Sequence, residues 1–469
     1  MARKVRRGFS ITRIFTLCTS TSGGFDRLLE AVAPNALHNS GHDFDAPKCH
    51  PGTRIAVIQT IMDWIAGVHD NQRGKDIAWV TGAAGAGKSA IGRTVCERCA
   101  KEGSLLASFF FGSNDGTRNH TQTFVSTIVY QVCCHSPAVR QVVTTIIDND
   151  PLIFNRTLRE QLSSLLIGPL ASEYSNEPGL APRVIVIDGL DECNNHSGQL
   201  EILDTILYLS TISPFPIRFL LCSRPENQIV NFFSSPHAQD VLLKIFLGNE
   251  YSPDADIRLY LSDRFTDIKK GHIFKGSIPD IWPREVHMHS LVEKSSGQFI
   301  YASTVVHYVE SPRHLPHQRL NSILGLRPPF KDLPFAQLDA LYSHIISMAD
   351  DPQGLVDLLA LPAFYNRVDI QAAEHILALE PGEIEILLAD CASIARVADD
   401  QQFSLLHKSF SDYLCDPHRS KQFCRNFVDT FPKNILRIME IFLGQRIFQI
   451  IYEDFIYWYL RYLQWRATY

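Results

Sequence analysis

Residues 77–92 read IAWVTGAAGAGKSAIG, and this stretch decides the fold. Its first five residues are apolar or β-branched and predict a buried strand. The segment GAAGAGKS at 82–89 then matches the pattern G-x-x-x-x-G-K-[ST], and apolar residues at helical spacing follow it at Ile91, Val95 and Cys99. A strand, a glycine loop and a helix in this order predict a Walker A phosphate-binding loop.

The glycine loop explains which residues are expected to bind a nucleotide. Glycines let successive backbone N–H groups turn toward a phosphate with no side chain in the way. Lys88 is expected to bridge the β- and γ-phosphates, and the Ser89 hydroxyl is expected to ligate Mg²⁺. The predicted ligand is ATP with Mg²⁺, and GTP is less favoured because the sequence has no NKxD motif for guanine. The predicted binding set is Gly82, Ala83, Ala84, Gly85, Ala86, Gly87, Lys88, Ser89 and Ala90.

A second motif, VIVIDGLDE at 184–192, joins an aliphatic strand to acidic residues. The strand brings Asp188 to its carboxyl end, the edge at which ligands bind in open α/β sheets. There the carboxylate is expected to hold Mg²⁺ through a water molecule, as in a Walker B motif. Asp191 or Glu192, with Glu192 favoured, is expected to polarise the water that attacks the γ-phosphate.

A third motif follows the apolar run IRFLLC at 217–222, which ends in Ser223, Arg224, Pro225 and Glu226. In P-loop ATPases with a catalytic glutamate, the strand after Walker B lies beside the P-loop strand, so its tip faces the γ-phosphate. Arg224 is therefore expected to sense or stabilise that charge. The alternative is an arginine that pairs with Glu226 at the surface.

Unbroken apolar runs predict strands at 77–81, 105–111, 184–188, 217–222 and 241–247. Strands that are buried on both faces have this pattern, and the helical stretches between them indicate repeated βαβ units. The predicted fold class is α/β, with a parallel P-loop NTPase sheet flanked by helices. A helix is also expected from Arg54, with Ile55, Ile58, Ile61, Met62 and Ile65 on its buried face, which Trp64 joins.

The part of the chain beyond residue 250 has a different character. Residues 253–325 read as helices, and the Pro-rich GLRPPFKDLP at 325–334 reads as a linker. The segment SIARVADDQQFSLLH at 393–407 has two short apolar segments around ADDQQ and predicts a hairpin.

The composition excludes some classes of protein. A net charge of −6 and a pI near 6.3 argue against a general nucleic-acid binder. The 11 cysteines at irregular spacing form no disulfide framework, so we expect reduced thiols in a cytoplasmic protein. Cys96 and Cys99 form a CxxC at helical spacing and are expected in the core rather than on zinc. No membrane span is expected, because no run of about twenty apolar residues occurs. The basic segment 1–22 is expected to be a frayed tail, with a mitochondrial presequence as the alternative.

These motifs together resemble a known family. CHPGTR at 49–54, TGAAGAGKSAIGRT, SFFFG, VIVIDGLDEC and CSRPE are similar to the NACHT-type P-loop NTPases of the STAND class. The resemblance is closest to the expanded set of mushroom-forming fungi, with a nephrocystin-like N-terminal NTPase domain. The later segments IPDIWP, SSGQFIYAST, LYSHI and LLHKSFSDYL agree, so the resemblance covers residues 45 to about 420.

The resemblance implies a molecular switch that holds a nucleotide between an NTPase core, a helical domain and a winged-helix domain. It also implies self-association, or association with homologous NACHT proteins. His407, in LLHKSF, becomes a candidate for the histidine that touches the β-phosphate in related switches, although the motif departs from the usual MHD pattern. The implied domains are a poorly ordered leader at 1–50, the NTPase core at 51–250, a helical domain at 251–328, a winged-helix-like domain at 329–425 and a helical extension at 426–469.

Two functions remain open at this point. The leading hypothesis is a signalling switch that binds ATP and hydrolyses it slowly, because the Walker A, Walker B and acidic residues are intact. The alternative is a nucleotide-binding scaffold or truncated decoy with negligible hydrolysis. It is motivated by a departure from the family, because the chain continues past the winged-helix region only into the aromatic stretch FQIIYEDFIYWYLRYLQW and not into a repeat array.

Overall fold

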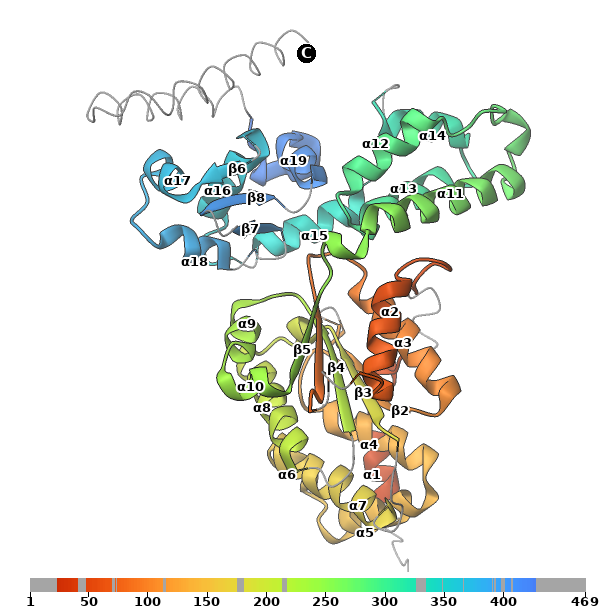
Figure 1. Ribbon diagram of the computed structural model, residues 1–469, viewed down its shortest axis with the longest axis vertical. Helices are drawn as coiled ribbons and strands as arrows, with labels where there is room; N and C mark the ends of the chain where they lie inside the picture. Colours follow the sequence, from red (N-terminus) through yellow and green to blue (C-terminus); the bar gives the residue numbers. More distant parts are fainter. Residues whose placement is uncertain are drawn as a thin grey trace, which may run out of the picture.

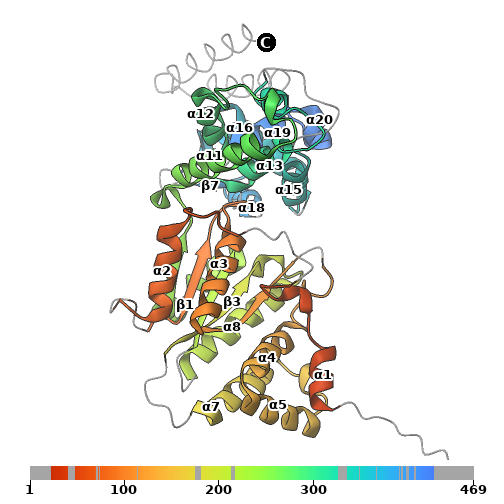
Figure 2. The ribbon, with the colours of Figure 1, turned by 90° about the vertical axis from the view of Figure 1, so that its right-hand side faces the viewer.

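The computed structural model describes residues 23–40, 48–69, 72, 74–112, 115–174, 181–212, 217–325, 335–347, 349–365, 367–389, 391, 394–397, 401–405 and 408–426. Within these residues the chain forms an α/β part, which ends near residue 251, and an α-rich part, which begins at 253 (Figure 1). The α-rich part lies over one end of the α/β part in both ribbon views (Figures 1 and 2).

The described α/β part is built on a five-stranded parallel sheet with the order β2-β3-β4-β1-β5. All the predicted strands are confirmed, and β4 lies between β3 and β1, as expected for the strand that follows the acidic motif. The fold class is therefore α/β, as predicted. The strands are β1 Ile77–Thr81, β2 Leu105–Phe110, β3 Arg183–Asp188, β4 Ile217–Ser223 and β5 Leu242–Phe246.

Both faces of the sheet are buried, which explains the unbroken apolar runs. Successive residues of a strand point to opposite faces. In β3, Val184 and Val186 therefore pack with α2 (Ile55–Ala66) and α3 (Lys88–Glu102). The intervening Ile185 and Ile187 pack into the core on the other face. The helices that share this second core are α1 Gly24–Glu30, α4 Phe124–His135, α5 Pro137–Asn149, α6 Leu158–Leu162, α7 Gly168–Tyr174, α8 His196–Ile212, α9 Asn227–Phe233 and α10 Pro236–Val241.

Helix α2 forms as predicted, but its buried face is shifted. Ile58 and Trp64 are buried as predicted, but Ile55 is 59% exposed, and Val57, which the periodicity does not predict, is fully buried. At 100° per residue, Val57 lies next to Trp64 and widens the buried stripe on that side of Ile58. Ile55 lies on the opposite border of that stripe, so it faces solvent.

The prediction of a poorly ordered leader over residues 1–50 is wrong for 23–40. This segment forms α1 and a short 3₁₀ helix, and Leu28 is fully buried. The backbone N–H of Gly24 donates to Asp148 Oδ1 at 2.7 Å, and the N–H of Ala33 donates to Thr127 Oγ1 at 3.0 Å. Because α1 is only seven residues long, it has too few turns for a helical period to show in the sequence. Residues 1–22 and 41–47 lie outside the described residues.

The α-rich part contains the helices expected over 253–325, followed by a smaller mixed unit. In that unit, β6, β8 and β7 form an antiparallel sheet in this order, and β7 and β8 are the hairpin expected within 393–407. The first helices are α11 Pro253–Gly271, α12 Glu285–Ser295, α13 Phe299–Val309 and α14 Pro316–Ile323. The later elements are α15 Ala336–Ser347, α16 Pro352–Tyr365, β6 Arg367–Asp369, α17 Ile370–Leu377, α18 Glu383–Ala389, β7 Ala395–Val397, β8 Gln402–Leu405, α19 Lys408–Cys415 and α20 Pro417–Ser420.

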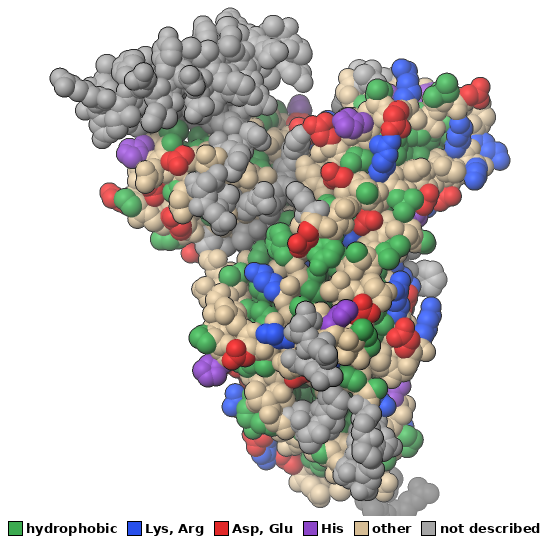
Figure 3. Space-filling view, in the orientation of Figure 1, with side chains coloured by type: hydrophobic (Ala, Val, Ile, Leu, Met, Phe, Trp, Pro, Cys, Tyr) green, Lys and Arg blue, Asp and Glu red, His purple; other side chains and the backbone are tan. Residues whose placement is uncertain are grey.

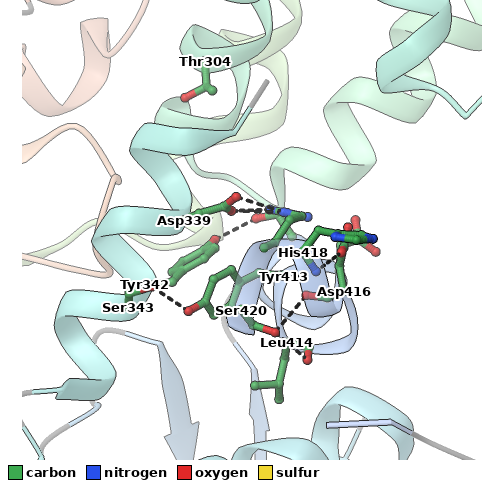
Figure 4. Close-up of polar contacts among 12 residues, drawn as sticks. Thr304, Asp339, Tyr342, Ser343, Tyr413, Leu414, Asp416, His418 and Ser420 are labelled. Atoms are coloured by element: carbon green, nitrogen blue, oxygen red, sulfur yellow. Dashed lines mark hydrogen bonds and ion pairs between the residues drawn. The ribbon is translucent and has the colours of Figure 1, made fainter. Parts of the chain in front are cut away.

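Side chains from α11–α14 and from α15–α19 share one hydrophobic core. Tyr301 of α13 stacks on Phe335, with ring centroids 5.5 Å apart. Asp339 of α15 accepts hydrogen bonds from Arg419 of α20 at 2.7–3.2 Å, and these side chains are only 10% and 12% exposed (Figure 4). The polar cluster in Figure 4 therefore fastens α20 to the helix that follows the α11–α14 unit.

The two parts of the molecule meet along a junction where hydrophobic side chains are visible at the surface (Figure 3). Lys and Arg side chains gather instead at the outer end of the α11–α14 unit. None of the helices in the described ranges combines the length and the apolar character that a bilayer crossing requires. Most of the predicted linker (326–334) and of the predicted extension (427–469) lies outside the described residues.

Candidate functional site

A cavity of about 470 Å³ lies where the carboxyl ends of β1, β3 and β4 face the α-rich part. The loop after β1, the tips of β3 and β4, the segment before α2, and α11 and α13 all contribute to its wall. It is lined by Lys48, Cys49, His50, Thr53, Arg54, Ala84, Gly85, Gly87, Lys88, Ser89, Ala90, Asp188, Gly189, Asp191, Glu192, Cys222, Arg224, Tyr260, Phe299, Ile300 and Ser303.

The glycine loop curls between β1 and α3 because two of its residues adopt left-handed backbone angles. Gly85 has a φ of 75° and Gly87 a φ of 92°, which a residue with a side chain rarely adopts. Gly87 is also the N-cap of α3, so the free N–H groups and the positive dipole end of that helix face the loop. This geometry is suited to binding an anion.

Lys88 is turned back onto the loop that precedes it. Its Nζ donates to Gly82 O at 2.8 Å and to Ala83 O at 2.9 Å. Burial lowers the pKa of Lys88 to about 8, although the nearby Asp191 carboxylate opposes this change. The ammonium group is therefore held at the mouth of the loop, where phosphate oxygens can replace the two carbonyl groups as acceptors.

Asp188 ends β3 and is 4% exposed. Burial raises its pKa to about 7, against a hydrogen bond with Ser89 that lowers it. Its Oδ1 is buried with no hydrogen-bond partner among the described residues. A carboxylate with an unused oxygen, next to a serine hydroxyl, is the hard oxygen donor set that Mg²⁺ prefers. Asp188 and Ser89 therefore fit a magnesium site.

Arg224 and Asp191 form a fixed pair at the tip of β4. The Arg224 backbone N–H donates to Asp191 Oδ1 at 2.9 Å, and Arg224 Nε lies 3.3 Å from Asp191 Oδ2. The Asp191 side chain is only 4% exposed. Glu226 accepts a hydrogen bond from Gln228 Nε2 at 2.8 Å. Asp191 thus holds Arg224 in the wall of the cavity.

Two predicted acidic residues therefore have different surroundings. Arg224 occupies both oxygens of Asp191. Glu192 follows in the same short 3₁₀ helix, and both residues line the cavity. The left-handed Gly189 (φ 71°) turns the chain after β3, so that both carboxylates return toward the glycine loop. A carboxylate that lines the cavity has access to a bound water molecule, which is the geometry that a general base requires.

The α-rich part closes the cavity directly over the glycine loop. The backbone N–H of Ile300 donates to Gly85 O at 3.3 Å. A Cβ atom at Gly85 would lie 2.3 Å from Ile300 Cγ2, so only glycine fits there. Phe299 and Tyr260 add aromatic rings to the same wall, with their centroids 6.1 Å apart.

The segment before α2 supplies another wall that the sequence motifs did not predict. His50 Nε2 lies 2.9 Å from Asp263 Oδ2 of α11, and Arg54 Nη2 donates to Ala86 O at 2.9 Å. In the sequence, CHPGTR indicated only a turn and a family likeness. A basic residue that follows this turn, one helix ahead of the Walker A strand, was the available signal.

The structure brings most of the predicted site residues together and leaves one undescribed. Cys96 and Cys99 are fully buried in the core between α2, α3 and the sheet. His407 lies outside the described residues, so its predicted contact stays a prediction. The predicted residues that line the cavity are Ala84, Gly85, Gly87, Lys88, Ser89, Ala90, Asp188, Asp191, Glu192 and Arg224, and Gly82, Ala83 and Ala86 complete the loop.

Among known families, the model described as Nephrocystin 3, N-terminal, matches residues 56–224. No curated protein matches the sequence of the chain. Among solved structures, Drosophila ORC bound to DNA is similar, with 13% identity, a TM-score of 0.32, and coverage of 88% of this chain and 95% of that chain. The Aeropyrum pernix ORC1 protein in complex with DNA has 14% identity, a TM-score of 0.37, and coverage of 78% and 92%. The Thermotoga maritima RuvB Holliday junction branch migration motor has 12% identity, a TM-score of 0.32, and coverage of 77% and 94%.

TM-scores this low carry no conclusion about function. The family match is more informative, because it begins in α2, includes the glycine loop and Asp188, and ends at Arg224. The sheet order and the loop geometry agree with it. Residues 56–224 are thus similar to the Nephrocystin 3, N-terminal family, and in this chain they carry the glycine loop and the acidic strand tip.

Proposed function

We propose that this protein is a Mg²⁺-dependent ATP-binding switch of the NACHT/STAND type, which hydrolyses ATP slowly. Its nucleotide state would control its conformation and its association with further copies or with homologous NACHT proteins. One observation carries the proposal: the glycine loop, the acidic strand tip and the α-rich part line one cavity. We place it in the cytoplasm and propose no nucleic-acid partner, because of the reduced cysteines and the negative net charge.

Nucleotide binding is assigned to the loop and to α3. Lys88 exchanges its bonds to the loop carbonyls for bonds to the β- and γ-phosphates, and backbone N–H groups of the loop donate to the phosphates. Ser89 and Asp188 are the residues that would hold Mg²⁺, which supplies positive charge against the phosphates. The buried Oδ1 of Asp188 supports this role.

Hydrolysis is assigned to the acidic pair and to Arg224. Both Asp191 and Glu192 line the cavity, and Glu192 is the proposed general base because both oxygens of Asp191 contact Arg224. Asp191 is a positioning residue that aims the Arg224 guanidinium. Arg224 would stabilise the negative charge that develops on the γ-phosphate.

The switch itself is assigned to the contact between the glycine loop and α13. A nucleotide that moves the loop also moves Gly85, which touches Ile300. The order α16–β6–α17–α18–β7–β8, with β8 between β6 and β7, supports the winged-helix-like unit that the family likeness implies. Because this unit shares a core with α11–α14, movement of α13 reaches it.

The test uses purified full-length protein with ATP and Mg²⁺. Lys88→Ala is expected to weaken ATP binding by about a hundredfold or more, since it removes a charged hydrogen-bond donor. Glu192→Gln is expected to bind ATP normally and to release phosphate about a hundredfold more slowly. Calorimetry measures the binding, and a phosphate-release assay measures the turnover.

Two results would contradict the proposal. If Lys88→Ala binds ATP with normal affinity, the glycine loop is not the phosphate-binding site. If wild-type protein binds ATP but releases no phosphate, the hypothesis of a nucleotide-binding scaffold is correct and that of a hydrolysing switch is wrong. Light scattering with ATP and with ADP tests self-association, which is expected to differ between the two nucleotides.

A further inference from the structure

Arg54 is a buried arginine in the wall of the cavity. Only 4% of the residue is exposed, and it lines the cavity. Its φ of 55° lies in the left-handed region, which is uncommon for any residue except glycine. Arginine is almost never buried to this extent unless it is paired.

Three elements hold Arg54 in place. Its backbone N–H donates to Asp256 Oδ2 of α11 at 2.9 Å. Its Nη2 donates to Ala86 O in the glycine loop at 2.9 Å. The guanidinium carbon lies 5.0 Å from the centre of the Phe299 ring of α13. Because both the backbone and the side chain are restrained, the direction of the guanidinium group is fixed.

The guanidinium group nevertheless keeps unused donors. Its Nε and Nη1 are buried with no hydrogen-bond partner in the part of the chain that the structure describes. Burial lowers the pKa of Arg54, and the Asp256 carboxylate opposes this change. Unpaired donors on a buried cation cost free energy. An anionic acceptor that enters the cavity would remove this cost.

The position of Arg54 indicates which part of a nucleotide it meets. Lys88 and Ser89 lie at the end of the cavity where β- and γ-phosphates are expected. The rings of Phe299 and Tyr260 lie on the α-rich side and offer an apolar wall for a base. Arg54 contacts both the glycine loop and Phe299, so it lies between the two ends.

We propose that Arg54 binds the α-phosphate of the nucleotide through Nε and Nη1, an inference that rests on the proposed function of the cavity. A guanidinium is suited to this acceptor because it is always charged and its hydrogen bonds to phosphate are strong. Through Asp256 and Phe299 the same residue contacts α11 and α13. Binding of the α-phosphate therefore restrains the α-rich part, independently of the γ-phosphate.

The test compares full-length wild type with Arg54→Gln and Arg54→Lys. Affinities for ADP, AMP and adenosine are measured in the presence of Mg²⁺ by equilibrium dialysis. Arg54→Gln is expected to weaken the binding of ADP and of AMP by a similar factor, about tenfold to a hundredfold. The affinity for adenosine is expected to stay unchanged, since only adenosine lacks the α-phosphate. Arg54→Lys keeps a positive charge and is expected to lose less affinity for ADP and AMP than Arg54→Gln does.

Arg218→Gln is the matched control, because Arg218 is also a buried arginine whose Nε and Nη1 have no hydrogen-bond partner among the described residues, but it does not line the cavity. It is expected to lower the midpoint of urea unfolding while the ratio of AMP to adenosine affinity stays near that of wild type. An equal loss of adenosine and AMP affinity in Arg54→Gln overturns the inference, since Arg54 would then contact the base or ribose, or shape the cavity. Unchanged ADP and AMP affinity overturns it as well.

The same measurements separate this inference from the proposed function. If wild-type protein binds no nucleotide, the proposed function fails. If wild type binds ADP and Lys88→Ala weakens that binding, but Arg54→Gln does not, only the inference about Arg54 fails.

Discussion

Asp115 shows how one carboxylate joins segments that are distant in the sequence. Its Oδ1 accepts hydrogen bonds from Thr117 N at 3.0 Å and Oγ1 at 2.7 Å. Its Oδ2 accepts from Asn35 Nδ2 and from Arg118 Nε, both at 3.1 Å. The N-terminal segment is therefore fastened to the loop after β2. These bonds, with that of the Thr117 hydroxyl the strongest, lower the pKa of Asp115 to about 2.

This pKa predicts how Asp115→Asn depends on pH. A carboxyl group whose pKa is lower in the folded state stabilises the fold above its unfolded pKa of 3.8, and this stabilisation is lost as pH falls through about 2. Asp115→Asn is therefore expected to unfold at lower urea than wild type at pH 7, and the difference is expected to shrink between pH 4 and pH 2. Asp204→Asn, at an exposed position of α8, serves as the control. A difference that stays constant down to pH 2 contradicts the prediction.

At the scale of the elements, the strands were predictable because each is an apolar run buried on both faces. The glycine loop and the strand tips were predictable because the functional residues of each lie within a few consecutive positions of the sequence. The other wall of the cavity could not be predicted in this way, because it joins elements more than two hundred residues apart. It consists of Arg54, Tyr260, Phe299 and Ile300. The exposed Ile55 was also missed, because a short helix has two possible borders to its apolar stripe.

The contact between the glycine loop and α13 yields a prediction about Gly85. Gly85→Ala would place a Cβ atom 2.3 Å from Ile300 Cγ2 at a φ of 75°. Gly103→Ala is the matched control, because Gly103 has a φ of 76° and nothing within 4 Å of such a Cβ atom. Gly103→Ala is expected to cost about 1 kcal/mol of unfolding free energy for the left-handed backbone alone. Gly85→Ala is expected to cost a further 1–3 kcal/mol or so for overpacking and to weaken ATP binding.

Urea unfolding and calorimetric titration with ATP measure both effects. If Gly85→Ala and Gly103→Ala lose the same unfolding free energy, α13 moves away from the added methyl group with no loss of stability. The loop would then be uncoupled from the α-rich part, and the proposed switch contact would be wrong.

For the whole molecule, the core that α11–α19 share predicts that the α-rich part unfolds as one unit. Asp339→Asn leaves the buried Arg419 without its charged partner and is expected to cost about 3 kcal/mol or more. Asp357→Asn is the control, since Asp357 is 50% exposed beside Arg425, and a loss below about 1 kcal/mol is expected. Scanning calorimetry measures the unfolding temperature and enthalpy of both variants.

The same scans test whether the α-rich part unfolds as one unit. A separate transition of the α15–α20 unit at a lower temperature would contradict the shared core.

The helix α1 has a practical consequence for how the NTPase region is cut from the chain. A fragment that starts at residue 51 keeps every Walker residue, yet it loses Leu28, Ala33 and Ala36, which are at most 1% exposed. The surfaces of α4 and α5 that these side chains cover would then face water, and exposed apolar surface promotes aggregation. A fragment that starts before Gly23 avoids this outcome, so the useful boundary for expression lies well ahead of the first recognisable motif.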